Sequence, residues 1–343
     1  MKILLVRNDK LGDFMLSYPS FIWLKASMPE AHVVALAPPY TAPMASLCPG
    51  IDSVLVEDWS EDGNAGWVRL AHQLRDESFD AVITLFSSSR VALAAAAAGI
   101  PYRLAPATKW AQFLYNHRLK QRRSRSEKPE YQYNLDLVER FLSDWQVEPA
   151  QQPARPFLRF DVDEVQALRT EFCDANQLSP EARLILIHPG SGGSARNLSP
   201  EQFGRLAHAL RSETVPLAFI IGCGPGENDK AEALAHELGA LPHAIYRSSS
   251  GIVDYARHIA FVDLFISGST GPLHIAGALD VPTAAFYTRR RSATPLRWQT
   301  LNSPERRLAF TPPDTADEMD MGSIDIAAAA AEINRCFFPQ PIR

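Results

Sequence analysis

Short runs of β-branched and leucine residues alternate along the chain with longer segments in which apolar residues recur at helical spacing. In the first half, strands are predicted at 3–6, 32–36, 53–56, 81–85 and 102–105, and helices over 12–27, 67–76 and 91–98. The second half repeats this plan with strands at 184–187, 217–221, 244–246, 264–266 and 283–286. Ser199-Pro200 marks a helix start, because serine caps a first turn in which proline is tolerated. This alternation predicts an α/β fold of parallel sheets wrapped in helices.

Two domains of similar size follow from this repeat and from the length of 343 residues, since a domain typically holds about 150. The segment 148–156, EPAQQPARP, is rich in proline and glutamine and is typical of a linker. We therefore expect the first domain over 1–155 and the second over 156–322. An alanine-rich helical pattern over 323–343 closes the chain, and one expected position for it is back on the first domain.

The composition is that of a globular protein, with 46% hydrophobic residues, 34 Lys+Arg, 39 Asp+Glu and a formal net charge of -5. This balance argues against disorder and against nucleic acid as a partner, which requires a basic surface. The four cysteines lie far apart without metal-ligand spacing, so we expect a reducing compartment and no structural metal. No apolar run approaches the about 20 residues of a membrane span, and the N-terminal run is short for a signal peptide. A cytoplasmic location is therefore expected.

The turn after the first predicted strand, Arg7-Asn8-Asp9-Lys10-Leu11-Gly12-Asp13, lies where ligands gather in an open α/β sheet. Gly12 permits a close approach of the backbone, and Asp13 falls at the start of the next helix. An acidic residue in a first helical turn is commonly a cap that complements the helix dipole. A carboxylate at this edge is also placed for catalysis, and both roles stay open for Asp13.

Three turns rich in glycine or hydroxyl side chains follow predicted strands of the second domain. They are 188–197 (HPGSGGSARN), 221–227 (IGCGPGE) and 267–277 (SGSTGPLHIAG). Free backbone N–H groups, small hydroxyls and the charge of Arg196 suit a phosphate or diphosphate. Each turn alone is also an ordinary tight connection between a strand and a helix. Because all three follow strands of one domain, together they predict a single site for a phosphorylated nucleotide.

Two side chains in these turns have open roles. Glu227 either belongs to an ordinary βα turn or accepts hydrogen bonds from ribose hydroxyls. His274 lies about one turn beyond the free N–H groups of Thr270 and Gly271, so it is either a buried structural histidine or a group that faces a bound anion. The turns lack both the GxxxxGK[ST] and the GxGxxG spacing, which disfavours a Walker-type nucleotidase and a nicotinamide dehydrogenase.

A basic stretch over 103–128 is the most unusual electrostatic feature of a chain with net charge -5. It holds eight cations against Glu127 alone, with three aromatic residues interleaved. Its cations are Arg103, Lys109, Arg118, Lys120, Arg122, Arg123, Arg125 and Lys128, and its aromatic residues include Trp110, Phe113 and Tyr115. One interpretation is a solvated surface, and the other is attraction to a polyanionic acceptor or an anionic membrane, with the aromatic residues meeting its apolar part.

With these motifs together, the chain resembles the bacterial lipopolysaccharide heptosyltransferases, glycosyltransferase family 9. The resemblance runs through most of the chain, and it is the order and spacing of the motifs that make it specific. They are Met1-Lys2-Ile3-Leu4-Leu5-Val6-Arg7 with Gly12-Asp13 and Pro19, His188-Pro189-Gly190-Ser191 with Arg196, Gly222 to Glu227, and Ser269 to Ala276. The resemblance implies the GT-B arrangement, two Rossmann-like doubly wound parallel-sheet domains facing a central cleft.

The implied activity is transfer of heptose from ADP-heptose to the phosphorylated lipid A-core acceptor of lipopolysaccharide, with inversion at the anomeric centre and without a metal or other cofactor. Asp13 corresponds to the family's catalytic carboxylate, a general base. The expected donor-binding residues are Gly190, Ser191, Ser194, Arg196, Glu227, Ser269, Thr270, Gly271 and His274. The expected acceptor-binding residues are Lys10, Gly12, Arg122, Arg123 and Arg125, the last three from charge alone. A peripheral contact with the cytoplasmic face of the inner membrane is also expected.

Two departures from the family pattern leave alternatives open. Many relatives carry aspartate where this chain has Ser269, so a different nucleotide-activated sugar is an alternative donor. The basic stretch over 103–128 is not a motif shared with the family, so acceptor binding there is inferred from charge alone. A non-catalytic protein that binds nucleotide sugars is the third alternative, and the carboxylate at position 13 argues against it.

Overall fold

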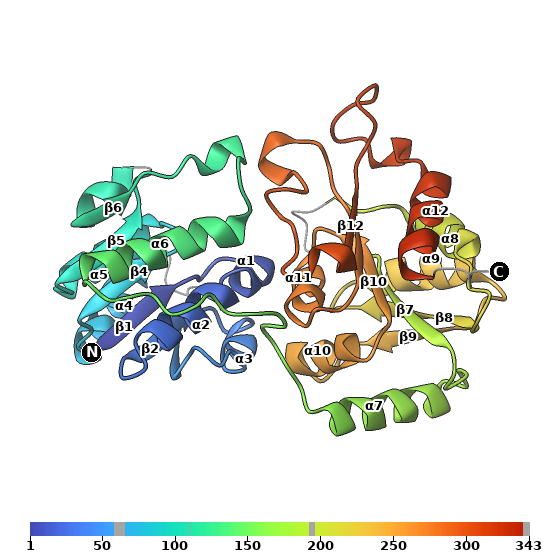
Figure 1. The fold of residues 1–343 in the computed structure, drawn as a ribbon, viewed down its shortest axis with the longest axis horizontal. Coiled ribbons are helices and arrows are strands. Elements are labelled where there is room, and N and C mark those ends of the chain that lie inside the picture. Colours follow the sequence, from blue (N-terminus) through green and yellow to red (C-terminus); the bar gives the residue numbers. More distant parts are fainter. Residues whose placement is uncertain (58–65, 109, 192–195, 339–343) are drawn as a thin grey trace. The chain divides into compact units, whose positions relative to one another are not determined.

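The computed structural model describes residues 1–57, 66–108, 110–191 and 196–338. The chain divides into two compact units, Met1–Leu158 and Arg159–Arg343. The residues just before the boundary carry no helix or strand, in agreement with the proline-rich sequence there. Each unit is described by itself below, with the element labels of Figure 1.

Six parallel strands form the sheet of the first unit, in the order β3-β2-β1-β4-β5-β6. They are β1 (Lys2–Val6), β2 (His32–Ala37), β3 (Ser53–Val56), β4 (Ala81–Thr84), β5 (Tyr102–Pro106) and β6 (His117–Leu119). The first five agree with the sequence prediction, whereas β6 is a three-residue edge strand inside the basic stretch that the apolar pattern does not reveal. In this order β1 and β4 are central neighbours, and the connections leave them in opposite directions across the sheet.

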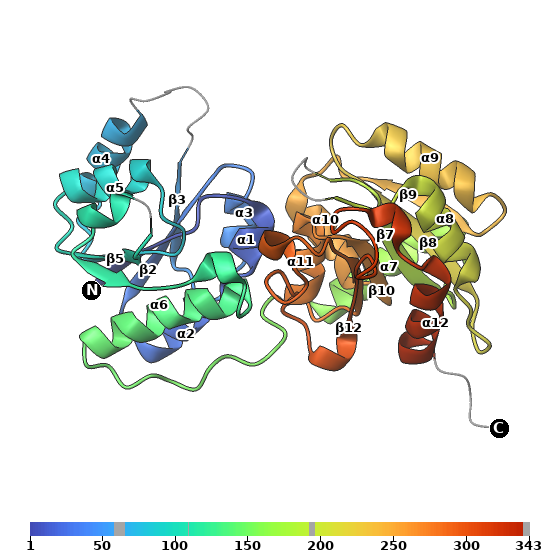
Figure 2. The same cartoon turned by 90° about the horizontal axis from the view of Figure 1, so that it is seen from above.

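The helices of the first unit cover both faces of this sheet (Figure 2). They are α1 (Leu11–Met15), α2 (Tyr18–Ser27), α3 (Ala42–Ala45), α4 (Gly66–Asp76), α5 (Ser89–Ala97) and α6 (Glu130–Asp144), with 3-10 helices η2 (Trp110–Leu114) and η3 (Arg123–Arg125). Leucine and valine side chains of α4 and α5 pack on one face of β1, β2 and β4. The single helix predicted over 12–27 is wrong: it is divided between α1 and α2, because Pro19 has no N–H for a continuous helix.

The second unit repeats the topology with strand order β12-β11-β10-β7-β8-β9. Its strands are β7 (Arg183–His188), β8 (Leu217–Cys223), β9 (His243–Arg247), β10 (Leu264–Gly268), β11 (Thr283–Phe286) and β12 (Arg307–Phe310). Its helices are α7 (Val162–Ala175), α8 (Pro200–Ala209), α9 (Asn228–Leu238), α10 (Ile252–Ala260), α11 (Gly271–Ala278) and α12 (Ile326–Phe337). Ser199 caps α8, as the sequence predicts, and the structure adds a reciprocal bond in which the Gln202 side chain accepts from the Ser199 backbone N–H. No helix among the described residues is long and apolar enough to cross a membrane.

The closing helix α12 lies in the second unit, which corrects its expected position on the first domain. Ile326, Ala329, Ala330 and Ile333 form its buried face and join the core that contains Phe203 and Leu206 of α8. Asn334 then fixes the helix, because its Oδ1 accepts from the backbone N–H of Arg211 at 3.0 Å and its Nδ2 donates to the carbonyl of Ala209 at 3.2 Å. The apolar stripe of α12 is therefore complementary to α8, a match that its own sequence does not disclose.

Candidate functional site

Arg7 leaves the carboxyl end of β1 and is almost fully buried, with 1% of its side chain exposed. A buried guanidinium must have its N–H groups satisfied, and three carboxylates do this. Its Nε donates to Asp9 Oδ1 at 2.9 Å, its Nη1 to Glu130 Oε1 at 3.0 Å, and its Nη2 to Asp13 Oδ1. Burial by itself would lower the pKa of Arg7, but these carboxylates hold it above its usual value. Arg7 is thus a fixed positive charge beneath Asp13.

Helix α6 supplies the far side of this cluster. Glu130 stands in its first turn and Asn134 one turn later, so both side chains point from the same face of the helix. Asn134 Oδ1 accepts from Arg7 Nη1 at 3.3 Å. Glu130 Oε1 also accepts from Arg123 Nη1 at 2.7 Å. The carboxylate of Glu130 therefore links Arg7 to the basic stretch.

Asp13 is the least ordinary carboxylate of the cluster. Its side chain is 14% exposed, and it lies in the first turn of α1 without acting as the N-cap, which is Lys10. Burial, followed by the nearby charges of Asp9 and Glu130, raises the pKa of Asp13 to about 7, against the opposing charge of Arg7. Among the described residues, only Arg7 hydrogen-bonds to its carboxylate, through Oδ1. A carboxylate with this proton affinity is suited to take a proton near neutral pH.

The other residues of this edge are fixed around Asp13 without entering the Arg7 cluster. Asn8 Nδ2 donates to Glu57 Oε2 at 2.5 Å, and Glu57 also pairs with Arg90 of α5. Burial raises the pKa of Glu57. Lys10 is exposed and Gly12 is half-buried, so the predicted acceptor residues of this turn lie at the surface beside Asp13.

In the second unit, the turns that follow β7, β8 and β10 lie at adjacent carboxyl ends, because these three strands are neighbours in the sheet. The side chain of Asn197 cross-links the turn after β7: its Nδ2 donates to the carbonyls of His188 at 3.1 Å and Gly190 at 3.0 Å. Gly268 at the end of β10 lies against this turn, since a Cβ built there would meet Arg196 O at 2.8 Å and Asn197 Oδ1 at 2.9 Å. The structure therefore brings the turns after β7 and β10 together.

Glu227 connects the turn after β8 to the same place. Its Oε2 accepts from the backbone N–H of Gly224 at 2.9 Å and lies 3.6 Å from His188 Nε2. Its carboxylate occupies the space beside Gly190, where an added Cβ would come within 2.1 Å of Cδ. Tyr255 Oη is 3.1 Å from His188 Nδ1 on the other side of the ring. Burial lowers the pKa of His188, against the opposing charge of Glu227.

Helix α11 begins directly after the third turn, at Gly271. Thr270 is its N-cap but makes no side-chain cap bond. The backbone N–H of Thr270, expected to be free, donates instead to the carbonyl of Gly268 at 2.8 Å, and Pro272 has no N–H. The N–H groups of Gly271 and Leu273 are therefore the ones left for another acceptor.

His274, in the first turn, is buried, and its Nδ1 has no hydrogen-bond partner among the described residues. Burial lowers the pKa of His274 to about 4, so the ring is neutral at physiological pH. An uncapped helix N-terminus with a neutral histidine suits an anion whose hydroxyl or phosphate oxygens meet both.

The remaining predicted donor residues lie on the same edge with different exposure. Ser191 and Ser269 are half-buried, and Arg196 is exposed. Ser194 lies outside the residues that the structure describes. Among the described parts of the chain, no three His, Cys, Asp or Glu side chains are grouped as a metal site would require.

The basic stretch is partly neutralised by the first unit itself. Arg123 pairs with Glu130, Arg125 with Glu127 at 3.5 Å, and Lys128 with Asp136. Arg122 is exposed and forms no ion pair with a described residue. Lys109 lies outside the described residues. Three of the predicted cations are therefore held by carboxylates a few residues further along the chain, and Arg123 in particular is a structural partner of the Arg7 cluster.

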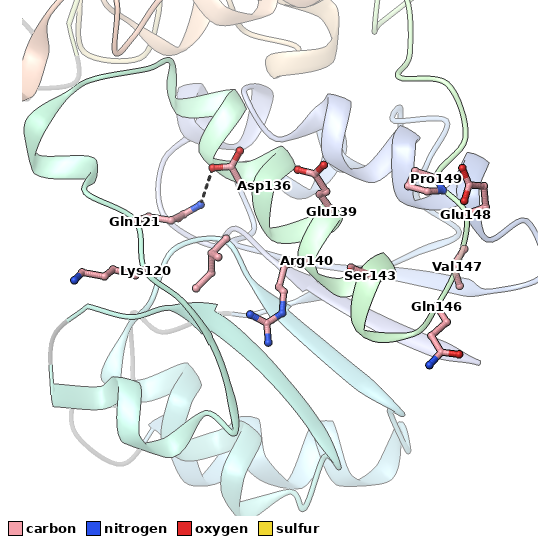
Figure 3. Close-up of a pocket in the computed structure, with 11 residues that line it drawn as sticks. Lys120, Gln121, Asp136, Glu139, Arg140, Ser143, Gln146, Val147, Glu148 and Pro149 are labelled. Atoms are coloured by element: carbon pink, nitrogen blue, oxygen red, sulfur yellow. Dashed lines mark hydrogen bonds between the residues drawn. The ribbon is translucent and has the colours of Figure 1, made fainter.

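Two polar hollows adjoin this stretch. The larger, about 780 Å³, lies between the end of β6, α6 and the segment after it, and both basic and acidic side chains line it (Figure 3). Its lining residues include Lys120, Gln121, Asp136, Glu139, Arg140 and Glu148. The smaller, about 330 Å³, shares Lys120, Gln121 and Asp136 and adds Arg122 and Lys128. Of the predicted site residues, only Arg122 lines either hollow.

The profile of glycosyltransferase family 9 (heptosyltransferase) matches residues 67–310. A protein of Haemophilus influenzae, named as a candidate glycosyltransferase, is 44% identical over 334 residues, which cover 97% of this chain and 96% of the relative. The chain belongs to glycosyltransferase family 9.

More distant relatives of this family 9 chain carry more specific names. Lipopolysaccharide heptosyltransferase 2 of Salmonella typhimurium is 25% identical over 299 residues, covering 84% of this chain and 82% of the relative. The solved structure of ADP-heptose lps heptosyltransferase II of E. coli has a TM-score of 0.74 at 21% identity and covers 98% of both chains. The fold is therefore the GT-B class of the heptosyltransferases, with a Rossmann-like parallel sheet in each unit.

Sequence reasoning on this family 9 chain missed the supports of its candidate residues. Glu130 and Asn134 belong to a helix that the apolar pattern did not single out, and their partner Arg7 is more than 120 positions away. Tyr255 and Asn197 were likewise not singled out. The available signal was the four-residue spacing of Glu130 and Asn134 in a polar first turn, which marks a face that pairs with something polar.

Replacing Arg7 by methionine is expected to lower the free energy of unfolding by about 3 to 5 kcal/mol, because it removes the counter-charge of Asp13 and leaves buried Glu130 with that of Arg123. The matched control is Arg140→Met, which breaks the exposed Arg140–Asp144 pair within α6 and is expected to cost below about 1 kcal/mol. Urea unfolding monitored by circular dichroism measures both. Equal losses in the two variants would contradict the role assigned to the buried cluster.

Proposed function

We propose that this family 9 glycosyltransferase moves heptose from ADP-heptose to a lipid A-core acceptor of lipopolysaccharide, with inversion at the anomeric carbon. The observation that carries the proposal is Asp13, a carboxylate at the carboxyl end of β1 whose pKa is raised to about 7 and whose position is fixed by Arg7. Such a group is partly ionised at neutral pH and accepts a proton as a general base.

In the proposed reaction, Asp13 takes the proton of an acceptor hydroxyl as its oxygen attacks the anomeric carbon of the donor. A new C–O bond forms while the bond from that carbon to the diphosphate oxygen breaks. The bonding pair leaves with ADP, and attack from the opposite face inverts the configuration. Arg7 stays charged throughout, so it stabilises ionised Asp13 before the transfer and keeps the carboxyl group oriented after it.

We assign the donor to the turns of the second unit. The diphosphate oxygens would accept hydrogen bonds from the free N–H groups at the start of α11 and from the hydroxyls of Ser191 and Thr270. Arg196 would add its positive charge. These groups stabilise the negative charge that develops on the leaving ADP. Gly190, Gly271 and Ser269 complete this edge, and neutral His274 donates or accepts a hydrogen bond without adding charge.

Glu227 is proposed to hold the ribose of the donor. Its carboxylate is fixed by Gly224 N–H and lies beside His188, so its remaining lone pairs can accept from two hydroxyl groups. The names of the more distant relatives support heptose and ADP as the transferred sugar and its carrier.

The acceptor is assigned to the first unit, beside Asp13. Exposed Lys10 and half-buried Gly12 flank the base, and Arg122 and Arg125 offer surface charge for acceptor phosphates. Arg123 acts differently from the other two: it is bound to Glu130 and contributes by fixing the cluster that holds Asp13.

A second candidate function keeps the chemistry and changes the donor. Ser269 is a neutral, half-buried hydroxyl at the start of the α11 turn, where a carboxylate would select sugar hydroxyls more strongly. Transfer of another nucleotide-activated sugar to a surface glycan is therefore the alternative, and a protein that binds nucleotide sugars without transfer is the non-catalytic one.

The donor is tested by incubating the purified chain with truncated core acceptors and a panel of ADP-, UDP- and GDP-sugars, and measuring released nucleotide. We expect turnover with ADP-heptose and little with the other donors, because the distant relatives are heptosyltransferases. Turnover only with a UDP- or GDP-sugar would establish the alternative donor. Binding of every nucleotide sugar without turnover would leave the non-catalytic protein.

The base is tested with Asp13→Asn, which keeps size and removes proton affinity. We expect transfer to fall about 10²- to 10⁴-fold while ADP affinity is unchanged. In the parent chain, kcat should rise with pH and level off above about 7, because the raised pKa of Asp13 requires that pH for ionisation. The control Asp9→Asn removes another carboxylate of Arg7 and should cost far less. A similar rate loss in both variants would show that charge balance around Arg7, and not a base at position 13, limits transfer.

The ribose contact is tested with Gly190→Ala. The added Cβ would come within 2.1 Å of the Glu227 carboxyl carbon, so that side chain must move away. We expect ADP binding, measured by calorimetry, to weaken about tenfold, in line with the loss of one charge-assisted hydrogen bond. Glu227→Gln should give a loss of similar size at unchanged side-chain volume. Unaltered ADP affinity in both variants would remove Glu227 from the donor site.

A further inference from the structure

The 3-10 helix η2, Trp110–Leu114, presents two aromatic side chains to solvent on the first unit. A 3-10 helix completes a turn in three residues, so side chains at i and i+3 lie in one column. Trp110 and Phe113 have this spacing, and they are 61% and 76% exposed. Large aromatic side chains carry a substantial hydrophobic cost in water, so two in one exposed column form a surface feature that calls for a partner.

The opposite side of η2 is anchored, which fixes the direction of the exposed column. Ala111 is fully buried and packs in a small cluster with Ala92 of α5, Ala105 of β5 and Tyr115, and Leu114 packs against the same cluster. Burying 111 and 114 turns 110 and 113 outward by the threefold geometry of the helix. The aromatic column is therefore held outward by the packing of the unit.

Positive charge adjoins the aromatic column. On the edge strand β6, His117 stacks on Tyr102 with ring centroids 4.0 Å apart, so Arg118 points to the opposite face of the strand. There its guanidinium lies 5.8 Å from the centre of the Phe113 ring. Arg118 is exposed, as are Lys120 and Arg122 after it, and none of the three forms an ion pair with a described acidic side chain. Arg123, Arg125 and Lys128 differ, since each is paired with a carboxylate.

We propose that the surface formed by Trp110, Phe113 and Arg118 docks on a lipid bilayer with anionic headgroups. Tryptophan and phenylalanine partition into the boundary between headgroups and acyl chains, while arginine and lysine pair with lipid phosphates. The complementarity is local, because the whole chain carries a net charge of -5 and is repelled by an anionic surface elsewhere. A stable protein partner would need about 800 Å² per side, far more than one short helix offers.

This docking surface is independent of the donor chemistry proposed above. It would hold the first unit at a membrane whichever sugar is transferred, and it would raise the local concentration of any acceptor with a lipid anchor. Failure of the vesicle test below leaves the donor assignment intact, and the reverse also holds.

The test is flotation of the full chain with phosphatidylcholine vesicles, with or without phosphatidylglycerol. We expect binding to the anionic vesicles that weakens with added salt, and little binding to pure phosphatidylcholine. The double variant Trp110→Ala/Phe113→Ala should lose about tenfold or more in partition coefficient, and Arg118→Gln about fivefold. The far-UV circular dichroism spectrum and the urea unfolding midpoint should stay unchanged in each variant, which verifies that the first unit is folded.

Two control variants match the change in chemistry at other exposed positions. Val162→Ser removes an apolar side chain that is 78% exposed on α7, and Arg335→Gln removes an exposed arginine of α12. Both should bind anionic vesicles as the parent does. Absence of parent binding, equal binding to neutral vesicles, or equal losses in the controls would each overturn the proposal. It would likewise be overturned by concentration-dependent dimers that the aromatic double variant abolishes, because the column would then serve a second copy of the chain.

Discussion

The buried charge of Arg7 is the constraint around which the first unit is organised. A guanidinium that has left water needs opposite charge and hydrogen bonds on all sides, and it draws them from three places in the chain. Asp9 and Asp13 come from the turn that follows β1, and Glu130 from the start of α6. Arg7 thereby ties the sheet to a helix more than 120 residues away, and the same bonds orient Asp13. Stability and the geometry of the proposed base have one physical origin.

In the second unit, the candidate site is shaped by closely packed backbone turns and not by a buried charge. Its turns after β7, β8 and β10 pack so closely that Gly190 and Gly268 have no room for a Cβ, and Glu227 occupies the space beside Gly190. The uncapped start of α11, exposed Arg196 and the rings of His188 and His274, whose pKa values burial lowers, make this edge polar. Oriented N–H dipoles at a helix start are suited to an anion, which is the basis of the proposed donor site.

Charge in this family 9 chain is a matter of local distribution. The stretch 103–128 has eight cations and a single acidic residue, yet Arg123 and Lys128 form ion pairs with Glu130 and Asp136, which lie outside it. On the edge strand β6, successive side chains point to opposite faces. His117 therefore stacks on Tyr102, whereas Arg118 lies near the Phe113 ring. A count of charges along the sequence overestimates the basic surface, and pairing across the fold corrects it.

The sequence by itself determined the α/β class, two parallel-sheet units and the turns that carry the candidate residues, because strand periodicity and glycine-rich turns are local signals. It also determined family membership through the order of its motifs. The short strand β6, the division of the helix at Pro19 and the position of α12 on α8 came only from the tertiary structure. So did the surroundings of Arg7, the partner of Asp13: nothing local to Glu130 or Arg123 identifies Arg7 as the residue they are linked to, since a buried ion pair joins residues that are neighbours in space. The physical reason is that the hydrophobic periodicity of a helix or strand is set by residues close together in the sequence. The pKa of a carboxylate depends on every charge and apolar group packed around it in space.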